Sequence, residues 1–264
     1  MVESLKKLGE ICQKPRYKEV GNWMVRHILR DAALPITWLL LHTNISANQV
    51  TLISLLAGLF GIALFSFKSQ TCFLLGAILV QLWYFLDHVD GQIARYRKTA
   101  SLSGRFFDFM THHIIHGVIF FSLGIYCFNE TSHFYYVVLG FIASLCILLF
   151  NMTSDTKYKT FFEQFNLATH VLVKAKTRSD QKRKDSITKQ IYSLLHKLVE
   201  IHVLMNILTV SAILQLFWSG YDLRLWLFWF YFSACLFLAT TKITFLISRH
   251  MIDKEFNEHF KLDA

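Results

Sequence analysis

Charged residues are scarce in this chain of 264 residues. Asp, Glu, Lys and Arg together make up 17% of the sequence, whereas hydrophobic residues make up 54%. A soluble domain usually has about a quarter of its residues charged. The apolar residues also occur in long blocks, and blocks of about 18 or more are typical of membrane-spanning helices. The sequence therefore argues against an ordinary soluble protein and predicts one helical bundle in a membrane.

Two further features are missing. The five cysteines include no pair at metal-ligand spacing and form no pattern typical of a disulfide framework. The first 30 residues are polar and of mixed charge, without the apolar segment of a cleavable signal peptide. We therefore expect the amino terminus to stay in the cytoplasm.

The apolar blocks predict an all-α fold, because backbone groups in lipid must be hydrogen-bonded within the chain. A polytopic membrane domain is expected over residues 48–248, between a cytoplasmic region at 1–47 and a cytoplasmic tail at 249–264. Its six expected transmembrane helices are 48–67, 71–88, 106–128, 134–152, 199–218 and 225–248.

The basic residues give the orientation. If the spans alternate in direction, one side of the membrane holds 24 of the 27 Lys and Arg residues. The exceptions are Lys68, Arg224 and Lys242. Loops rich in Lys and Arg face the cytoplasm. This asymmetry explains the net charge of +9 without a nucleic-acid partner.

Residues 19–34 predict a juxtamembrane helix with an apolar side around Trp23 and Ile28. It either lies on the inner leaflet as an amphipathic helix or packs against the bundle. Pro35 is expected to end or redirect it.

Basic residues also follow the fourth span. Lys157 and Lys159 either hold an anionic acceptor or are ordinary flanking charges, which we favour. The run at 174–184 either attracts anionic lipid headgroups or is a solvated cytoplasmic loop, and again the second is favoured.

Polar residues at the ends of the second and third spans carry the chemistry. Asp87, Asp90 and Asp108 lie at or inside the expected membrane boundary, where an ionised group costs about 2.5 kcal/mol or more. Asp87 and Asp90 share one helix face, and Asp108 and His112 share another. A short cytoplasmic turn joins the two spans, so we expect all four side chains to converge.

Clustered carboxylates repel one another unless a cation lies between them. Divalent cations such as Mg²⁺ prefer carboxylate oxygens, and a pair of them can stabilise a displacement at phosphorus. Gly91 leaves space for a phosphate or nucleotide near the helix, and Arg95 offers a planar cation to phosphate oxygens.

The run from Asp87 to His112 resembles the signature of the CDP-alcohol phosphotransferase family, D-x2-D-G-x2-A-R-x8-G-x3-D-x3-D. Seven of the eight fixed positions agree. The stretch from Ala47 to Thr51 resembles the family's PN-x-x-T entry, with alanine in place of proline. The resemblance covers about residues 20–250.

This resemblance implies a membrane transferase of phospholipid or related lipid biosynthesis. Its site would hold two divalent cations, Mg²⁺ or Mn²⁺, at the cytoplasmic face. Its donor would be CDP-diacylglycerol or a CDP-alcohol, its acceptor a soluble alcohol or a lipid, and CMP would leave. Membrane lipids are implied partners, nucleic acid is not, and a homodimer is an open option. The implied metal ligands are Asp87, Asp90 and Asp108, and the implied nucleotide-site residues are Gly91, Ala94, Arg95 and Gly104.

His112 departs from the family pattern, which has an aspartate at this position as a metal ligand and proposed general base. An imidazole can take either role, so we expect His112 to be catalytic, metal-binding or both. The alternative is a non-catalytic relative that binds nucleotide or lipid and has lost its chemistry at this position. His88 and His113 are expected to be polar filler, whereas His116 is balanced between filler and a role in the site.

Overall fold

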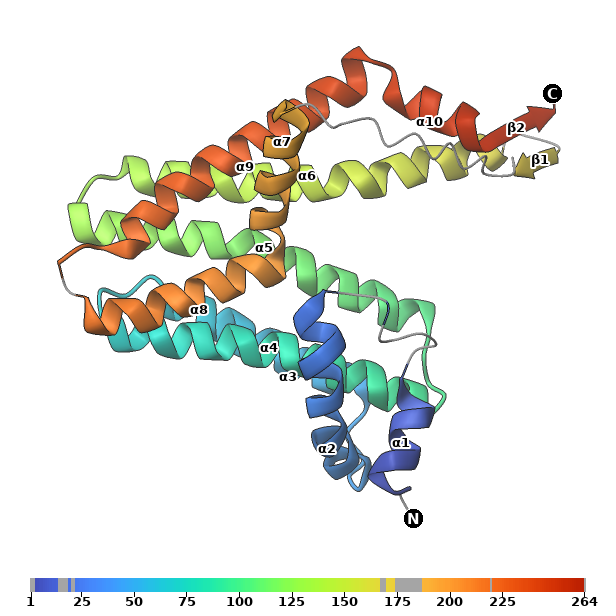
Figure 1. Ribbon diagram of the computed structural model, residues 1–264, viewed down its shortest axis with the longest axis horizontal. Coiled ribbons are helices and arrows are strands. Elements are labelled where there is room, and N and C mark those ends of the chain that lie inside the picture. The colour runs from blue at the N-terminus through green and yellow to red at the C-terminus, as the bar shows by residue number, and fades with distance from the viewer. Residues whose placement is uncertain are drawn as a thin grey trace.

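The computed structural model describes residues 3–13, 19, 22–166, 170–173, 187–218 and 220–263. Apart from two strands of four residues, the elements within these ranges are helices (Figure 1). In chain order they are α1 (Leu5–Cys12), η1 (Val25–Leu29), α2 (Arg30–Leu41), α3 (Ala47–Leu64), α4 (Gln70–Tyr96), α5 (Leu102–Thr131), α6 (Tyr135–Asn166), β1 (His170–Val173), α7 (Ile187–Val199), α8 (Ile201–Phe217), α9 (Leu223–Ser248), α10 (Met251–His259) and β2 (Phe260–Asp263).

The long helices have the length and composition of membrane spans. α3, α4, α5, α6 and α9 each qualify, and α7 with α8 qualifies as a pair that is bent by 68°. The predicted all-α membrane fold is therefore confirmed, with five single-helix candidate spans and the bent α7–α8 pair as the candidate for the sixth. The outward faces are apolar, as Leu52, Leu56 and Phe60 on α3 illustrate. Such faces suit contact with lipid.

Close helix contacts depend on glycine. A Cβ atom on Gly76 of α4 would lie 2.5 Å from the carbonyl oxygen of Gly61 on α3. Gly124 of α5 and Gly140 of α6 approach each other in the same way, because a Cβ on Gly124 would lie 2.8 Å from Gly140 Cα. Small residues let membrane helices pack backbone against backbone, which fixes α3 against α4 and α5 against α6.

Three helices run past the cytoplasmic ends that hydropathy predicted. α4 continues beyond residue 88 to Tyr96, α5 begins at Leu102 rather than 106, and α6 extends beyond 152 to Asn166. The added turns of α4 and α5 contain polar residues that line a cavity, so an apolar window ends too early there. Ser101 caps α5, since its hydroxyl accepts a hydrogen bond from the Gly104 N–H at 3.0 Å.

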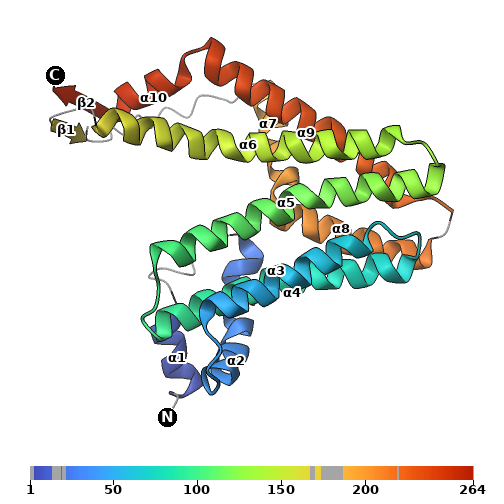
Figure 2. The ribbon, with the colours of Figure 1, turned by 180° about the vertical axis from the view of Figure 1, so that it is seen from behind.

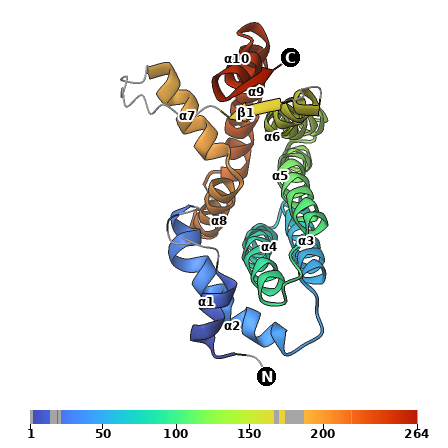
Figure 3. The same cartoon turned by 90° about the vertical axis from the view of Figure 1, so that its right-hand side faces the viewer.

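The amino-terminal region packs against the bundle. Figure 3 shows α1 and α2 beside α4. Ala33, Thr37 and Leu41 of α2 are buried, and the Thr37 hydroxyl donates to Gln92 Oε1 at 2.6 Å. Trp23 and Ile28, which precede α2, are exposed. The contacts of α2 favour packing against the bundle, and a position of this segment on the inner leaflet stays a prediction.

The expectation that Pro35 ends this helix is wrong, because Pro35 lies inside α2. A proline within a helix removes one backbone hydrogen bond and crowds the preceding turn. Burial of α2 residues on both sides of Pro35, at Ala33 and Thr37, offsets that cost.

Both chain ends lie away from the α5–α6 and α8–α9 turns, towards the other end of the molecule (Figures 1 and 2). There β1 pairs with β2 in antiparallel register, joining the end of α6 to the carboxyl terminus. This arrangement agrees with both termini lying on one side of the membrane.

Candidate active site

The end of α4 and the first turns of α5 bring three ionisable side chains together. His112 Nε2 lies 3.2 Å from Asp87 Oδ1 and 3.4 Å from Asp108 Oδ1. One ligand atom from each residue falls within 4.8 Å of the others. The predicted convergence of α4 and α5 side chains thus includes Asp87, Asp108 and His112.

The donor set of this cluster suits a divalent cation. Two carboxylates and an imidazole are ordinary ligands of such ions. Asp108 Oδ1 is buried and makes no hydrogen bond to any residue that the structure describes. Its 3.4 Å contact with His112 Nε2 is too long for a good hydrogen bond, and a bound cation would satisfy this buried oxygen.

Asp90 is set apart from this three-residue group. Its carboxylate is buried, and Oδ2 accepts a hydrogen bond from the Thr51 hydroxyl at 2.5 Å. Thr51 belongs to α3, so the close packing of α3 on α4 determines where the Asp90 side chain points.

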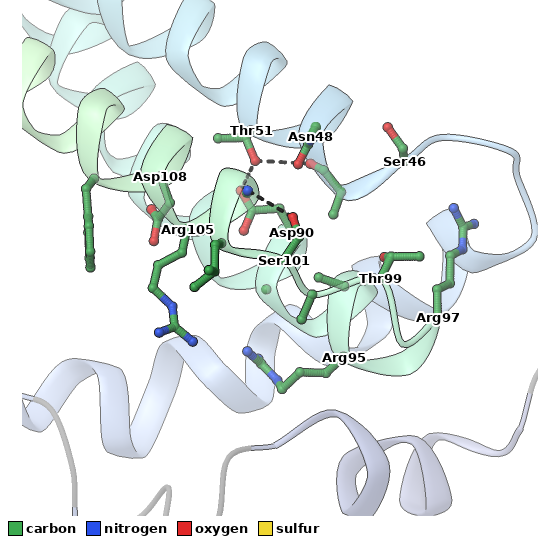
Figure 4. A pocket seen from close by; sticks show the side chains of 17 residues that line it. Ser46, Asn48, Thr51, Asp90, Arg95, Arg97, Thr99, Ser101, Arg105 and Asp108 are labelled. Carbon is green, nitrogen blue, oxygen red and sulfur yellow. Dashed lines mark hydrogen bonds between the residues drawn. The ribbon is translucent and has the colours of Figure 1, made fainter.

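A cavity of about 670 Å³ opens beside these residues (Figure 4). Asp90 and Asp108 line it, as do all four residues that the sequence predicted for a nucleotide site: Gly91, Ala94, Arg95 and Gly104. Asn48 and Thr51 enter it from α3, and Ser101 and Arg105 from the start of α5.

Two arginines at the cavity also hold backbone in place. Arg95 donates from Nε to the carbonyl oxygen of Cys12, which ends α1. A Cβ on Gly91 would lie 3.1 Å from Arg95 Nη1, so the missing side chain leaves room for the guanidinium. Arg97 donates to Ile45 O at 2.6 Å and to Thr43 O at 2.7 Å, which secures the segment before α3.

A comparison with protein families found a match between residues 44–180 and the CDP-alcohol phosphatidyltransferase model. The matched segment is 137 residues, more than half of the chain, and it contains the complete run from Asp87 to His112. The chain belongs to the CDP-alcohol phosphatidyltransferase family. A comparison with curated proteins gave no match.

Membership of the CDP-alcohol phosphatidyltransferase family relates the chain to transferases that use CDP-alcohol donors in lipid synthesis. The position that carries the last aspartate of the family signature is the one at which His112 contacts both Asp87 and Asp108. The substituted residue therefore still belongs to the carboxylate cluster, and its ring packs edge-on against Trp83 at 5.0 Å.

Three other histidines have partners outside this cluster. His116 is buried, with Nε2 2.9 Å from the Val199 carbonyl oxygen and Nδ1 3.1 Å from Asn151 Nδ2. Because both ring nitrogens are engaged, His116 has none left for substrate. His88 Nδ1 lies 2.8 Å from the Tyr84 carbonyl oxygen, and His113 Nε2 lies 3.2 Å from Asp155 Oδ2.

The lysines after the fourth span also have local partners. Lys157 Nζ lies 2.8 Å from Glu255 Oε1, and Lys159 lies 4.0 Å from Glu163. These ion pairs favour the interpretation of both lysines as flanking charges. The basic run at 174–184 lies outside the described residues.

Sequence reasoning gave no role to Thr51, Ser101 or Arg105, although each lines the cavity. Thr51 stood in the entry motif, and Arg105 directly follows the signature residue Gly104. Their roles depend on packing between helices, which one sequence does not contain.

Proposed function

We propose that the chain transfers a phosphoalcohol or phosphatidyl group from a CDP-linked donor to an alcohol and releases CMP. The observation that supports this most is the Asp87–Asp108–His112 cluster beside a cavity lined by the signature residues. The cavity is of the size that small-molecule sites usually have. The residues lining it combine carboxylates for cations with arginines for phosphate oxygens.

Asp87, Asp108 and His112 would hold a divalent cation, and Asp90 is the fourth candidate ligand. A bound Mg²⁺ or Mn²⁺ would neutralise the carboxylates and polarise a phosphoryl oxygen. Thr51 holds the Asp90 carboxylate in place, and Gly91 lines the cavity and leaves room for the Arg95 guanidinium.

In the proposed step, the acceptor hydroxyl oxygen bonds to the donor phosphorus farther from the cytidine. The bond from that phosphorus to the bridging oxygen breaks, and the bridging oxygen leaves as part of CMP. The hydroxyl proton passes to a base. His112 would serve as a ligand through Nε2 or as that base, and both roles are consistent with its place beside the carboxylates.

Two substrate arrangements fit this reaction. A CDP-linked lipid can donate to a soluble alcohol, or a CDP-linked small alcohol can donate to a lipid hydroxyl. In both, one substrate is a lipid, which agrees with a site at the ends of membrane-spanning helices.

The test is CMP release by the purified protein in lipid vesicles with Mg²⁺ or Mn²⁺. One arm supplies CDP-diacylglycerol with inositol or sn-glycerol 3-phosphate, and the other supplies CDP-choline or CDP-ethanolamine with diacylglycerol. Release that stops with EDTA and returns with the cation supports the proposal. Nucleotide binding without CMP release from any of these pairs would favour the non-catalytic relative.

A further inference from the structure

Arg105 differs from the other two arginines that line the cavity. Arg95 and Arg97 donate hydrogen bonds to backbone carbonyls that hold α1 and the segment before α3. Arg105 is exposed at the cavity, and its guanidinium makes no hydrogen bond or ion pair with any residue that the structure describes. Its guanidinium therefore has no structural task in this part of the chain.

Its position relates it directly to the cluster. Arg105 precedes Asp108 by three residues and His112 by seven, so the three side chains share one face of α5. Figure 4 shows Arg105 and Asp108 among the side chains that line the cavity. Arg105 lies one turn nearer to the cytoplasmic end of the helix.

Arg105 and Asp108 do not pair with each other, although they carry opposite charges one turn apart. Asp108 is turned towards Asp87 and His112, and its Oδ1 is buried without a hydrogen-bond partner in the described chain. The carboxylates of the cluster suit a cation, and the unpaired Arg105 guanidinium at the same cavity suits an anion, so a ligand that carries both signs would satisfy both. A phosphate group with its divalent cation has this property.

We propose that Arg105 binds phosphate oxygens of a substrate and is a specificity-determining residue of this site. The inference rests on the proposed function, because it assigns the ligand to the same cavity. A guanidinium presents several N–H donors in a plane and matches phosphate oxygens in pairs, which a lysine cannot do. The phosphate belongs either to the diphosphate of the CDP-linked donor or to an anionic acceptor.

Binding to the purified protein in detergent with Mg²⁺ separates these two sources without relying on turnover. The probes are CDP, cytidine and sn-glycerol 3-phosphate, titrated into wild type, Arg105→Gln and Arg105→Lys. If the donor supplies the phosphate, Arg105→Gln should weaken CDP binding by about tenfold or more and leave cytidine binding unchanged. Arg105→Lys should recover part of the loss. If the acceptor supplies it, sn-glycerol 3-phosphate binding should fall instead.

Lys98→Gln is the matched control. Lys98 is exposed in the turn between α4 and α5 and is not among the residues that line the cavity. Lys98→Gln therefore removes one positive charge, as Arg105→Gln does, but at a position away from the cavity. Affinities in Arg105→Gln that equal those of wild type or Lys98→Gln for both phosphate probes would overturn the inference. Unfolding midpoints of all variants show whether each remains folded. The wild-type protein could bind CDP in a way that depends on Arg105 and yet release no CMP. That result would refute the proposed function and leave the role of Arg105 intact.

Discussion

The Asp90 carboxylate accepts a hydrogen bond from the Thr51 hydroxyl, so the two residues can be tested separately. Asp90→Asn removes the charge and keeps an oxygen that can accept from Thr51 Oγ1. We expect CMP release to fall at least about a hundredfold, because a lost ligand charge at a cation site costs several kcal/mol of transition-state stabilisation. The unfolding midpoint in detergent should stay close to that of wild type.

Thr51 supplies the control for this prediction. Thr51→Ser keeps the hydroxyl and should retain most activity, whereas the isosteric Thr51→Val should lose part of it. Near-normal CMP release by Asp90→Asn would rule out Asp90 as a cation ligand.

His112 offers a second test at the same scale. Its Nε2 atom lies between the two carboxylates of the cluster, so His112→Ala should lower CMP release about 10²- to 10⁴-fold, the range for a lost acid–base or ligand group. His112→Asp restores the family's aspartate and should retain or increase activity. Equal activity of wild type and both variants would mean that His112 has no role. If wild type is inert and His112→Asp releases CMP, the chemistry was lost at this residue.

The sequence predicted which residues form the site, but it did not predict the hydrogen bonds that hold them in place. The spacing of Asp87, Asp108 and His112 is enough to place them together, because α4 and α5 are consecutive helices joined by a short turn. The hydrogen bond from Thr51 to Asp90 depends instead on how closely α3 approaches α4, which Gly61 and Gly76 permit. Arg105 drew no prediction from the sequence, because its place at the cavity depends on how α3, α4 and α5 pack.

At the scale of elements, the break between α7 and α8 involves His116. The carbonyl oxygens of the last α7 residues have no partner within the helix. His116 binds the one at Val199, and the Tyr231 hydroxyl donates to the one at Leu198 at 3.2 Å. Unsatisfied carbonyls are expensive in a membrane, so these two contacts offset the cost of the 68° bend between α7 and α8.

We therefore expect His116→Phe to destabilise the protein by about 1–3 kcal/mol, the cost of leaving a buried acceptor unpaired. His116→Gln, which can still donate to Val199 O, should be milder. The measurement is the unfolding midpoint in detergent together with CMP release per folded molecule. A drop in CMP release at unchanged stability would instead place His116 in the chemistry.

The helices themselves could be predicted wherever apolar composition decides the structure. The bend at residue 200 could not, since no proline or glycine marks it, and the side chains that bind the free carbonyls come from α5 and α9. Pro35 shows the reverse case: a local signal to end a helix is outweighed by burial of Ala33 and Thr37 on either side.

At the scale of the whole molecule, the three basic residues that break the charge asymmetry have structural partners. Arg224 is buried and donates to Phe67 O at 2.7 Å and to Lys68 O at 2.9 Å, joining the start of α9 to the turn between α3 and α4. Lys68 lies 4.0 Å from Glu130, and Lys242 donates to Phe150 O at 2.9 Å. These exceptions therefore do not weaken the expected orientation.

That orientation predicts which side a membrane-impermeant thiol reagent reaches. Four of the five native cysteines are buried, so only Cys72 should contribute background, and Cys72→Ser removes it. In that background, Ser132→Cys in the α5–α6 turn should label in intact cells. Arg178→Cys in the basic run and Lys98→Cys in the α4–α5 turn should label only after the membrane is opened. Labelling of Lys98→Cys in intact cells would put the cavity outside. CDP-linked substrates in the cytoplasm could not then reach Asp90 and Asp108. That result would rule out the proposed reaction.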